Sequence, residues 1–214
     1  MITYQVATTH PTQPPSTAFE YWFAQNGTFA HALRPGLHIL IPISVHTQPI
    51  KGLVPLTPFV KLRPRVPGIL LQRMLALANH ELPNEILFHL VLENDQWQLI
   101  TPEQIQSPQS CTPALTELGS STQNALIEIH SHGTMPAYFS QTDDQDECNG
   151  FRIYGVLGKL HTCHPELLLR VGLFGHAYTI PANFIFTSFD GVQDLTQAQG
   201  CVYYAMQGNP TTQL

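Results

Sequence analysis

One stretch of the chain, residues 69–82, carries apolar residues at the spacing of an amphipathic helix. The apolar positions are Leu70, Leu71, Met74, Leu75, Leu77 and Ala78. The stretch starts just past Pro67 and stops at Pro83, and prolines commonly lie at helix boundaries. The pattern therefore predicts a helix near the middle of the chain.

The other apolar runs are short and rich in β-branched and aromatic residues, which is typical of strands. Several such runs fill residues 28–56, where prolines and an Arg-Pro-Gly sequence separate them. Residues 93–96 read as a hairpin turn between two further strands. Strands are thus expected, beyond those in 28–56, at residues 85–92, 97–100, 124–132, 151–160, 167–180 and 182–189.

Polar and proline-rich segments fill the gaps between these runs. We expect residues 1–18 to form a loosely structured N-terminal segment and residues 102–113 to form a loop. We expect residues 207–214 to form a frayed C-terminal end. A second helix is expected after Ser140. One central helix, a second helix and many strands indicate an α/β or α+β sheet domain.

The chain divides into three parts on this pattern. A strand-rich N-terminal extension covers residues 1–65, a sheet domain with helices covers residues 66–190, and a C-terminal tail covers residues 191–214. With 214 residues the chain is long enough to bury a real core. No internal repeat is visible in the sequence.

Composition excludes several classes of function. Hydrophobic residues make up 43% and charged residues 11%, which argues against a disordered chain. The net charge is −6 and there is no Lys/Arg run, so binding to nucleic acid is not expected. The sequence has no apolar run of membrane-spanning length and no secretory signal, so a cytoplasmic protein is expected, with its four cysteines as free thiols.

The stretch IEIHSHGTMPAYFSQTDD, residues 127–144, carries the candidate chemistry. His130 and His132 lie two apart on an expected strand and therefore face the same way. The first turn of a helix opening near Ser140 brings Asp143 back towards them. Two imidazoles, one carboxylate and an open fourth position form the ligand pattern of a catalytic Zn²⁺. Ser140 is placed to stabilise a developing oxyanion.

Simpler explanations exist for parts of this pattern. The chain holds 11 histidines, so a His-x-His pair alone is a weak signal. Ser140 and Asp143 also match a helix-capping box, which needs no metal. A capped helix would hold the aspartate still, so the capping role and the metal role are compatible.

The full spacing, His-x-His, seven residues, Ser, two residues, Asp, resembles the JAMM motif of the MPN/JAB metalloprotease family at all four positions. The resemblance implies a curved mixed sheet flanked by helices. It also implies one zinc ion per chain, held by His130, His132 and Asp143, with Ser140 assisting the oxyanion. Members of the family include zinc isopeptidases that cut ubiquitin or ubiquitin-like tails from lysines.

The family also uses an upstream glutamate at the start of the strand that follows a long helix. Glu85 fits that place, 45 positions before His130. Glu128 is an alternative, because it shares a strand face with the two histidines. Glu81, at the end of the expected helix, is a third option.

Longer segments resemble the PRTRC system protein A family, whose genes lie beside those of proteins similar to ubiquitin-activating enzymes, conjugating enzymes and ubiquitin-like modifiers. The segments are RPGLHILIPI, NEILFHLVL, ALIEIHSHGTMPAYFSQTDDQDE, GFRIYGVLGKL and RVGLFGHAYTIPANFIF. The resemblance implies a bacterial zinc isopeptidase or peptidase acting on the tail of a ubiquitin-like protein. A processing peptidase for a sulfur-carrier protein and a non-catalytic interaction module of the same fold are the alternatives.

Other residues near the motif allow more than one interpretation. The acidic residues after Asp143, which are Asp144, Asp146 and Glu147, are expected to form a solvated first turn that suits the start of a helix, and the alternative is that one of them accepts a hydrogen bond from a ligand histidine. The sequence His-Thr-Cys-His at 161–164 could bind a metal, but a connecting loop is the expected reading. Tyr138 and Phe139 could line a groove for a peptide tail or pack in the core.

Overall fold

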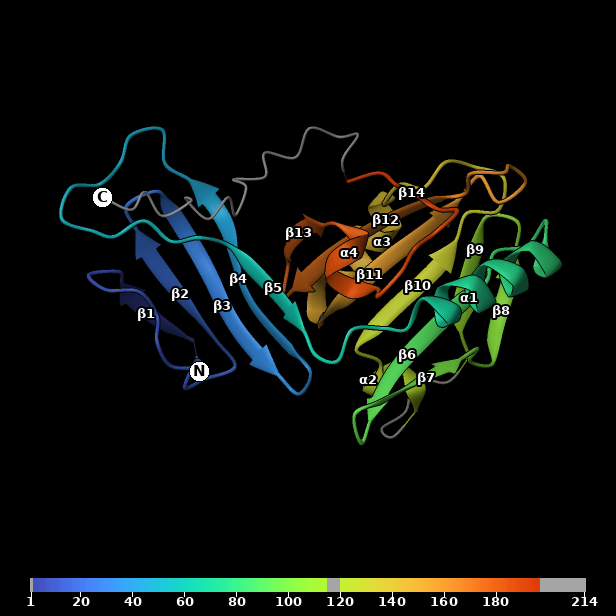
Figure 1. Cartoon of the computed structure of the whole chain (residues 1–214), viewed down its shortest axis with the longest axis horizontal. Coiled ribbons are helices and arrows are strands. Elements are labelled where there is room, and N and C mark those ends of the chain that lie inside the picture. Colours follow the sequence, from blue (N-terminus) through green and yellow to red (C-terminus); the bar gives the residue numbers. More distant parts are fainter. Residues whose placement is uncertain (1, 115–119, 197–214) are drawn as a thin grey trace, which may run out of the picture.

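The computed structural model describes residues 2–114 and 120–196 and contains two main sheets (Figure 1). The N-terminal sheet has the order β1-β2-β3-β4-β5. Its strands are β1 (Thr3–Val6), β2 (Phe19–Ala24), β3 (Gly27–Arg34), β4 (Leu37–Val45) and β5 (Phe59–Leu62). β1 is parallel to β2 and the other pairs are antiparallel. The strand-rich N-terminal section predicted from the sequence is confirmed.

The second sheet follows the order β13-β12-β11-β10-β6-β7, with the short β14 paired to β12. Its strands are β6 (Leu87–Glu93), β7 (Gln96–Ile100), β10 (Ile127–Ser131), β11 (Phe151–Gly158), β12 (Glu166–Leu173), β13 (His176–Ile180) and β14 (Gln193–Asp194). β10 runs parallel to β11 and antiparallel to β6, so the sheet is mixed. With few helices beside these sheets, the fold is α+β.

The predicted central helix is confirmed as α1 (Gly68–Glu81), which begins directly after Pro67. It buries Leu71, Met74, Leu75 and Ala78 against the second sheet. The shorter helices are α2 (Ser121–Asn124), α3 (Gln141–Asp146), the 3₁₀ turn η1 (Glu147–Asn149) and α4 (Ala182–Ile185). The helix expected after Ser140 is therefore confirmed as α3. In the part of the chain that is described, no helix has the length and hydropathy needed to cross a membrane.

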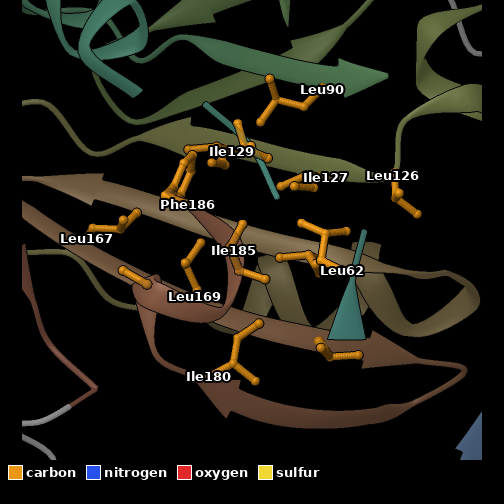
Figure 2. Packing of buried hydrophobic residues seen from close by; sticks show 14 of the residues in the cluster. Leu62, Leu90, Leu126, Ile127, Ile129, Leu167, Leu169, Ile180, Ile185 and Phe186 are labelled. Atoms are coloured by element: carbon orange, nitrogen blue, oxygen red, sulfur yellow. The ribbon is translucent and has the colours of Figure 1, made fainter. Parts of the chain in front are cut away.

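One hydrophobic core joins the two sheets. Residues of β3, β4 and β5 pack in the same cluster as residues of α1, β6, β10 and β12. Figure 2 shows part of this cluster, with a leucine of β5 among side chains of β6, β10 and β12. At the sheet boundary the Phe19 and Phe174 rings stack, and Tyr21 Oη lies 2.7 Å from His176 Nε2. The main core occupies one face of the second sheet, and the opposite face carries polar side chains beside a small separate apolar cluster.

Two segments expected to lack regular structure form strands. Residues 102–113 were expected as a loop but form the hairpin of β8 (Gln104–Ser107) and β9 (Ser110–Pro113). Their polar side chains gave no alternating pattern, and the two strands pair through backbone bonds. The side-chain amide of Gln104 bonds to both backbone groups of Leu87 and so attaches the hairpin to β6. Residues 1–18, which were expected to be loosely structured, contain β1, where Tyr4 stacks on Tyr21 of the neighbouring strand.

Two strand predictions near the C-terminal end are also wrong in detail. Residues 167–180 form two strands, because Phe174 and Gly175 turn the chain with φ of 43° and 86°. Residues 182–189 begin with the helical turn α4, and Ala182 N donates to Asp194 Oδ2 at its start. A short apolar run fits a buried helical turn as well as a strand, so the pattern could not separate them. The end predicted to fray, residues 207–214, lies outside the described residues.

Candidate metal centre

Strand β10 places its side chains on two faces with opposite roles. Ile127 and Ile129 are fully buried in the core, while His130 points to the other face. Ser131 faces away from the histidines, as expected, and its Oγ accepts a hydrogen bond from Ile86 N at 3.1 Å. Just past the strand, His132 N donates to Leu157 O of β11 at 2.7 Å, which fixes the backbone at the second histidine.

Ser140 and Asp143 cap α3 reciprocally. Asp143 N donates to Ser140 Oγ at 3.2 Å, and Ser140 N donates to Asp143 Oδ2 at 2.6 Å. This is the capping box expected from the sequence. The capping box uses Oδ2 of Asp143, and the other carboxylate oxygen, Oδ1, lies 3.5 Å from His130 Nε2. The cap therefore presents the aspartate to the histidine pair.

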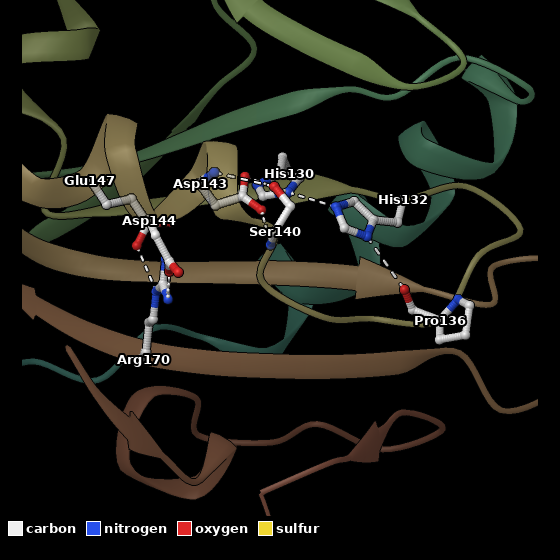
Figure 3. A network of polar contacts seen from close by, with 8 residues as sticks. All are labelled: His130, His132, Pro136, Ser140, Asp143, Asp144, Glu147 and Arg170. Atoms are coloured by element: carbon white, nitrogen blue, oxygen red, sulfur yellow. Dashed lines mark hydrogen bonds and ion pairs between the residues drawn. The ribbon is translucent and has the colours of Figure 1, made fainter.

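The three side chains converge on one point (Figure 3). His130 Nε2 and His132 Nε2 are 3.1 Å apart, and the ligand atoms of His130, His132 and Asp143 all lie within 4.8 Å of one another. Burial lowers the pKa of both histidines below its usual value, which favours the neutral imidazole that metals bind. Two imidazole nitrogens and one carboxylate oxygen at this separation fit a Zn²⁺ ion.

Glu85 faces the same point from the neighbouring strand. His130 pairs with Leu87, and continuing that antiparallel register places Glu85 opposite His132. The residue is 4% exposed and lines a cavity of about 810 Å³ together with both histidines, Ser140 and Asp143. Burial, and then the charge of Asp143, raise the pKa of Glu85 to about 7. Such a carboxyl can both accept and return a proton near neutral pH.

The two alternative glutamates occupy different surroundings. Burial alone would raise the pKa of Glu128, but its contact with His89 and the charge of Arg152 outweigh burial and hold that pKa below its usual value. Arg152 Nη1 lies 3.1 Å from its carboxylate and His89 Nε2 3.5 Å. Glu81 lies at the end of α1 beside His80, 3.3 Å away, and does not line the cavity. Among the three, the geometry favours Glu85 as a base.

The family model of prokaryotic homologs of the JAB domain matches residues 67–168, a range that holds Glu85 and all four motif positions. This segment is a JAB domain. No protein with a curated description matches the chain. Among solved structures, the chain is similar to a Desulfitobacterium hafniense protein determined in solution, at 16% identity and a TM-score of 0.39, over 55% of this chain and 87% of that one.

The acidic residues after Asp143 are less solvated than the sequence suggested. Glu147 is buried, and its Oε2 accepts a hydrogen bond from Arg170 Nε at 2.7 Å. Asp144 accepts one from the same guanidinium, at 2.6 Å (Figure 3). The expectation of a solvated first turn is therefore wrong for Glu147. Arg170 of β12 ties α3 and η1 to the sheet of the JAB domain.

The sequence His-Thr-Cys-His at 161–164 forms the connection between β11 and β12, as expected, and His161, Cys163 and His164 are exposed. Across the described ranges, the group of His130, His132 and Asp143 is the one with converging ligand atoms. Of the two aromatic residues before Ser140, Tyr138 lines the cavity with its ring 4.6 Å from that of His132. Phe139 packs instead beside a small apolar cluster and under Arg170.

The β8–β9 hairpin is the part of the cavity that sequence reasoning missed. Residues 109–113 form part of its wall, and the two histidines line the same cavity. Cys111 is among them, and burial raises the pKa of its thiol well above the usual range. A thiol kept protonated in this way is a poor nucleophile. Nothing in the local pattern of residues 102–113 pointed to this wall, because a polar hairpin and a polar loop have the same composition.

Proposed function

We propose that this protein is a zinc-dependent isopeptidase or peptidase that cuts at the C-terminal tail of a ubiquitin-like protein. The observation that carries the proposal is the convergence of His130, His132 and Asp143 in one cavity with Glu85 and Ser140. The match to the JAB family model supports it. The five side chains come from β6, β10 and α3 or their ends, so the arrangement is built on regular elements rather than on mobile loops.

A zinc ion bound there would supply a Lewis acid that activates water and polarises the scissile carbonyl. Glu85 would take the proton from the attacking water and deliver it to the leaving amine. Among the described residues no group donates a hydrogen bond to the Glu85 carboxylate, so both its oxygens are available for this transfer. Its position opposite His132 keeps it beside the metal ligands without making it one of them.

Ser140 is suited to the oxyanion. Its Oγ accepts the hydrogen bond from Asp143 N, so the hydroxyl proton remains free to donate to the substrate carbonyl oxygen. The capping geometry fixes the direction of that donor before substrate binds. Preorganised donors of this kind stabilise the charge that develops on the carbonyl oxygen in the transition state.

The substrate in this proposal is an extended tail that ends in small residues. β9 is the edge of its two-stranded sheet and lines the cavity, so an extended chain could add to it by backbone hydrogen bonds. A large side chain next to the scissile bond would crowd the metal ligands and Tyr138. The ubiquitin-like identity of the substrate rests on the family resemblance, as do partners similar to activating and conjugating enzymes.

The test is mass spectrometry of a ubiquitin-like protein carrying a short C-terminal extension, incubated with the purified full chain. We expect cleavage after the last residue of the tail, loss of cleavage on chelation and recovery on adding zinc. Alkylation of the cysteines should leave the activity in place, since burial keeps the Cys111 thiol protonated. Cleavage that survives chelation and stops on alkylation would contradict the metalloprotease mechanism, and a protein that binds zinc without cleaving would fit an interaction module.

A further inference from the structure

The segment between His132 and Ser140 joins the two halves of the candidate metal centre. It leaves the end of β10, crosses the end of β11 and returns to start α3. Any change in its path would change the distance between the histidine pair and Asp143. What holds this segment in place therefore determines whether the ligands converge.

One peptide unit in the segment contacts both the centre and the sheet. The carbonyl of Pro136 lies 3.4 Å from Nδ1 of His132 (Figure 3). The other end of the same peptide, the N–H of Ala137, donates to Oε2 of Glu166 at 3.0 Å. His132, one peptide plane and a carboxylate thus form a continuous chain of hydrogen bonds. A proton on Nδ1 leaves Nε2, the nitrogen that faces His130, with its lone pair free.

Glu166 is built into the sheet as a fixed acceptor. It opens β12, is 5% exposed, and its second oxygen lies 2.6 Å from Lys159 Nζ. Lys159 in turn donates from its backbone N–H to Met135 O at 2.7 Å, so the residue that neutralises the carboxylate also binds the segment. A buried carboxylate with a partner on each oxygen has little freedom to move.

The sheet also leaves room for the peptide. A Cβ at Gly158 of β11 would lie 2.2 Å from Ala137 N, a distance that no side chain could tolerate. The backbone of the segment therefore rests directly on glycine at the end of β11. Contact at this range places the Ala137 N–H within reach of Glu166 on the adjacent strand, since Gly158 pairs with Glu166.

We propose that Glu166 is a positioning residue that orients His132 through the Pro136–Ala137 peptide. When Glu166 accepts the hydrogen bond from Ala137 N–H, it polarises the peptide and makes Pro136 O a stronger hydrogen-bond acceptor. A stronger acceptor fixes the ring plane and tautomer of His132 and raises the basicity of Nε2, as partners of metal-bound histidines do elsewhere. The inference rests on the metal centre of the proposed function and extends it to a residue outside the JAMM-type motif.

The experiment measures zinc affinity of the full chain by competition with a chromophoric chelator. We expect Glu166→Ala to bind zinc about 10–100-fold more weakly than the wild type. Glu166→Gln, which keeps an oxygen for the Ala137 N–H, should lose less, and it serves as the second variant if the alanine variant does not fold. The matched control is Leu173→Ala, a fully buried residue at the far end of the same strand. It should lower the unfolding temperature and leave zinc affinity unchanged.

A second readout follows the histidine directly. In ¹⁵N-histidine NMR spectra of the metal-free protein, the Nδ1–H of His132 should exchange faster with solvent in Glu166→Ala than in the wild type or Leu173→Ala. Wild-type zinc affinity together with an unchanged His132 signal in Glu166→Ala would overturn the inference. If the wild type itself binds no zinc, the proposed function fails, and the exchange rate of the His132 proton alone decides whether Glu166 orients the ring.

Discussion

Two pairs of histidines in this molecule approach each other closely, one in each sheet. His130 and His132 bring their Nε2 atoms to 3.1 Å in the JAB domain, and His31 and His38 bring theirs to 2.7 Å in the N-terminal sheet. Both pairs are at least partly buried, and burial lowers the pKa of all four imidazoles. Proximity and protonation therefore do not distinguish a candidate metal site from a structural pair.

The two histidine pairs differ in where the nearest carboxylate lies. In the JAB domain a carboxylate oxygen of Asp143 lies 3.5 Å from His130 Nε2, on the side where the two nitrogens meet. In the N-terminal sheet the nearest carboxylate, Glu20, lies 3.8 Å from Nδ1 of His31, on the far side of the ring. Its oxygens already accept hydrogen bonds from Ser16 and Trp22. The second pair thus has no carboxylate aimed at its meeting point.

The charge near each pair differs as well. Burial, and to a smaller extent the charge of Lys61, lowers the pKa of His38. The Lys61 ammonium would also oppose a cation at the N-terminal pair. At the JAB pair the negative charges of Asp143 and Glu128 would attract a cation, and each acts on His130 more strongly than the opposing charge of Arg170. Two histidines become a plausible metal site only when a third donor and a favourable field converge on the same point.

The largest expected effect separates the two pairs by zinc content. His130→Ala and Asp143→Ala should each weaken zinc binding by well over about 100-fold, because they remove ligands, whereas loss of a residue that only supports a ligand costs about 10–100-fold. His38→Ala and Asp144→Ala should keep about one zinc per chain. Metal analysis of the four purified variants checks this. Full zinc in both ligand variants, with loss in His38→Ala, would move the site to the N-terminal sheet.

The next effect separates two glutamates that flank the JAB pair. Glu85→Gln should lower turnover by about 10²–10⁴-fold with zinc still bound, because the amide cannot take a proton. Glu128→Gln should keep most of the activity, since that carboxylate is already engaged by Arg152 and His89. Cleavage rates and zinc content of both variants provide the measurement. An inactive Glu128 variant beside an active Glu85 variant would reverse the assignment.

A smaller effect is expected at Ser140. Loss of one oxyanion donor costs about 10²–10³ in rate, so Ser140→Ala should be slow with zinc retained. The same change removes the cap of α3 and should lower stability by about 1 kcal/mol. Single-turnover cleavage gives the first quantity and thermal unfolding the second. A variant that cleaves at the wild-type rate but unfolds earlier would show that Ser140 acts as a cap alone.

The smallest effect concerns the N-terminal pair and pH. Burial and then the neighbouring His38 lower the pKa of His31 in the folded state, while Glu20 acts in the opposite direction. The unfolded chain therefore binds a proton more readily, and stability is lost as pH falls below the ordinary histidine pKa of about 6.5. Between pH 7.5 and 5.5 the unfolding temperature of His31→Gln should fall less than that of the wild type, by roughly a few degrees. An equal fall in both would mean that His31 is not a buried neutral group.

Sequence reasoning located the elements that carry strong periodicity or a fixed motif. α1 and β10 follow from apolar spacing, and the His-x-His pair with Ser140 and Asp143 follows from strand alternation and a capping box. The same reasoning could not find Glu166, because its role depends on β12 lying beside β11 and on the path of the segment over Gly158. It also missed the β8–β9 hairpin, whose pairing is held by backbone groups that every sequence has.

The core shared by the two sheets has a consequence for how the protein can be produced and divided. Val60 and Leu62 of the N-terminal sheet are buried in the same cluster as Leu71 and Met74 of α1. A fragment expressed from residue 66 onwards would expose the surface that these strands cover and would tend to aggregate. The two sheets should therefore melt in one calorimetric transition, and we expect the JAB domain to need the N-terminal sheet in order to fold.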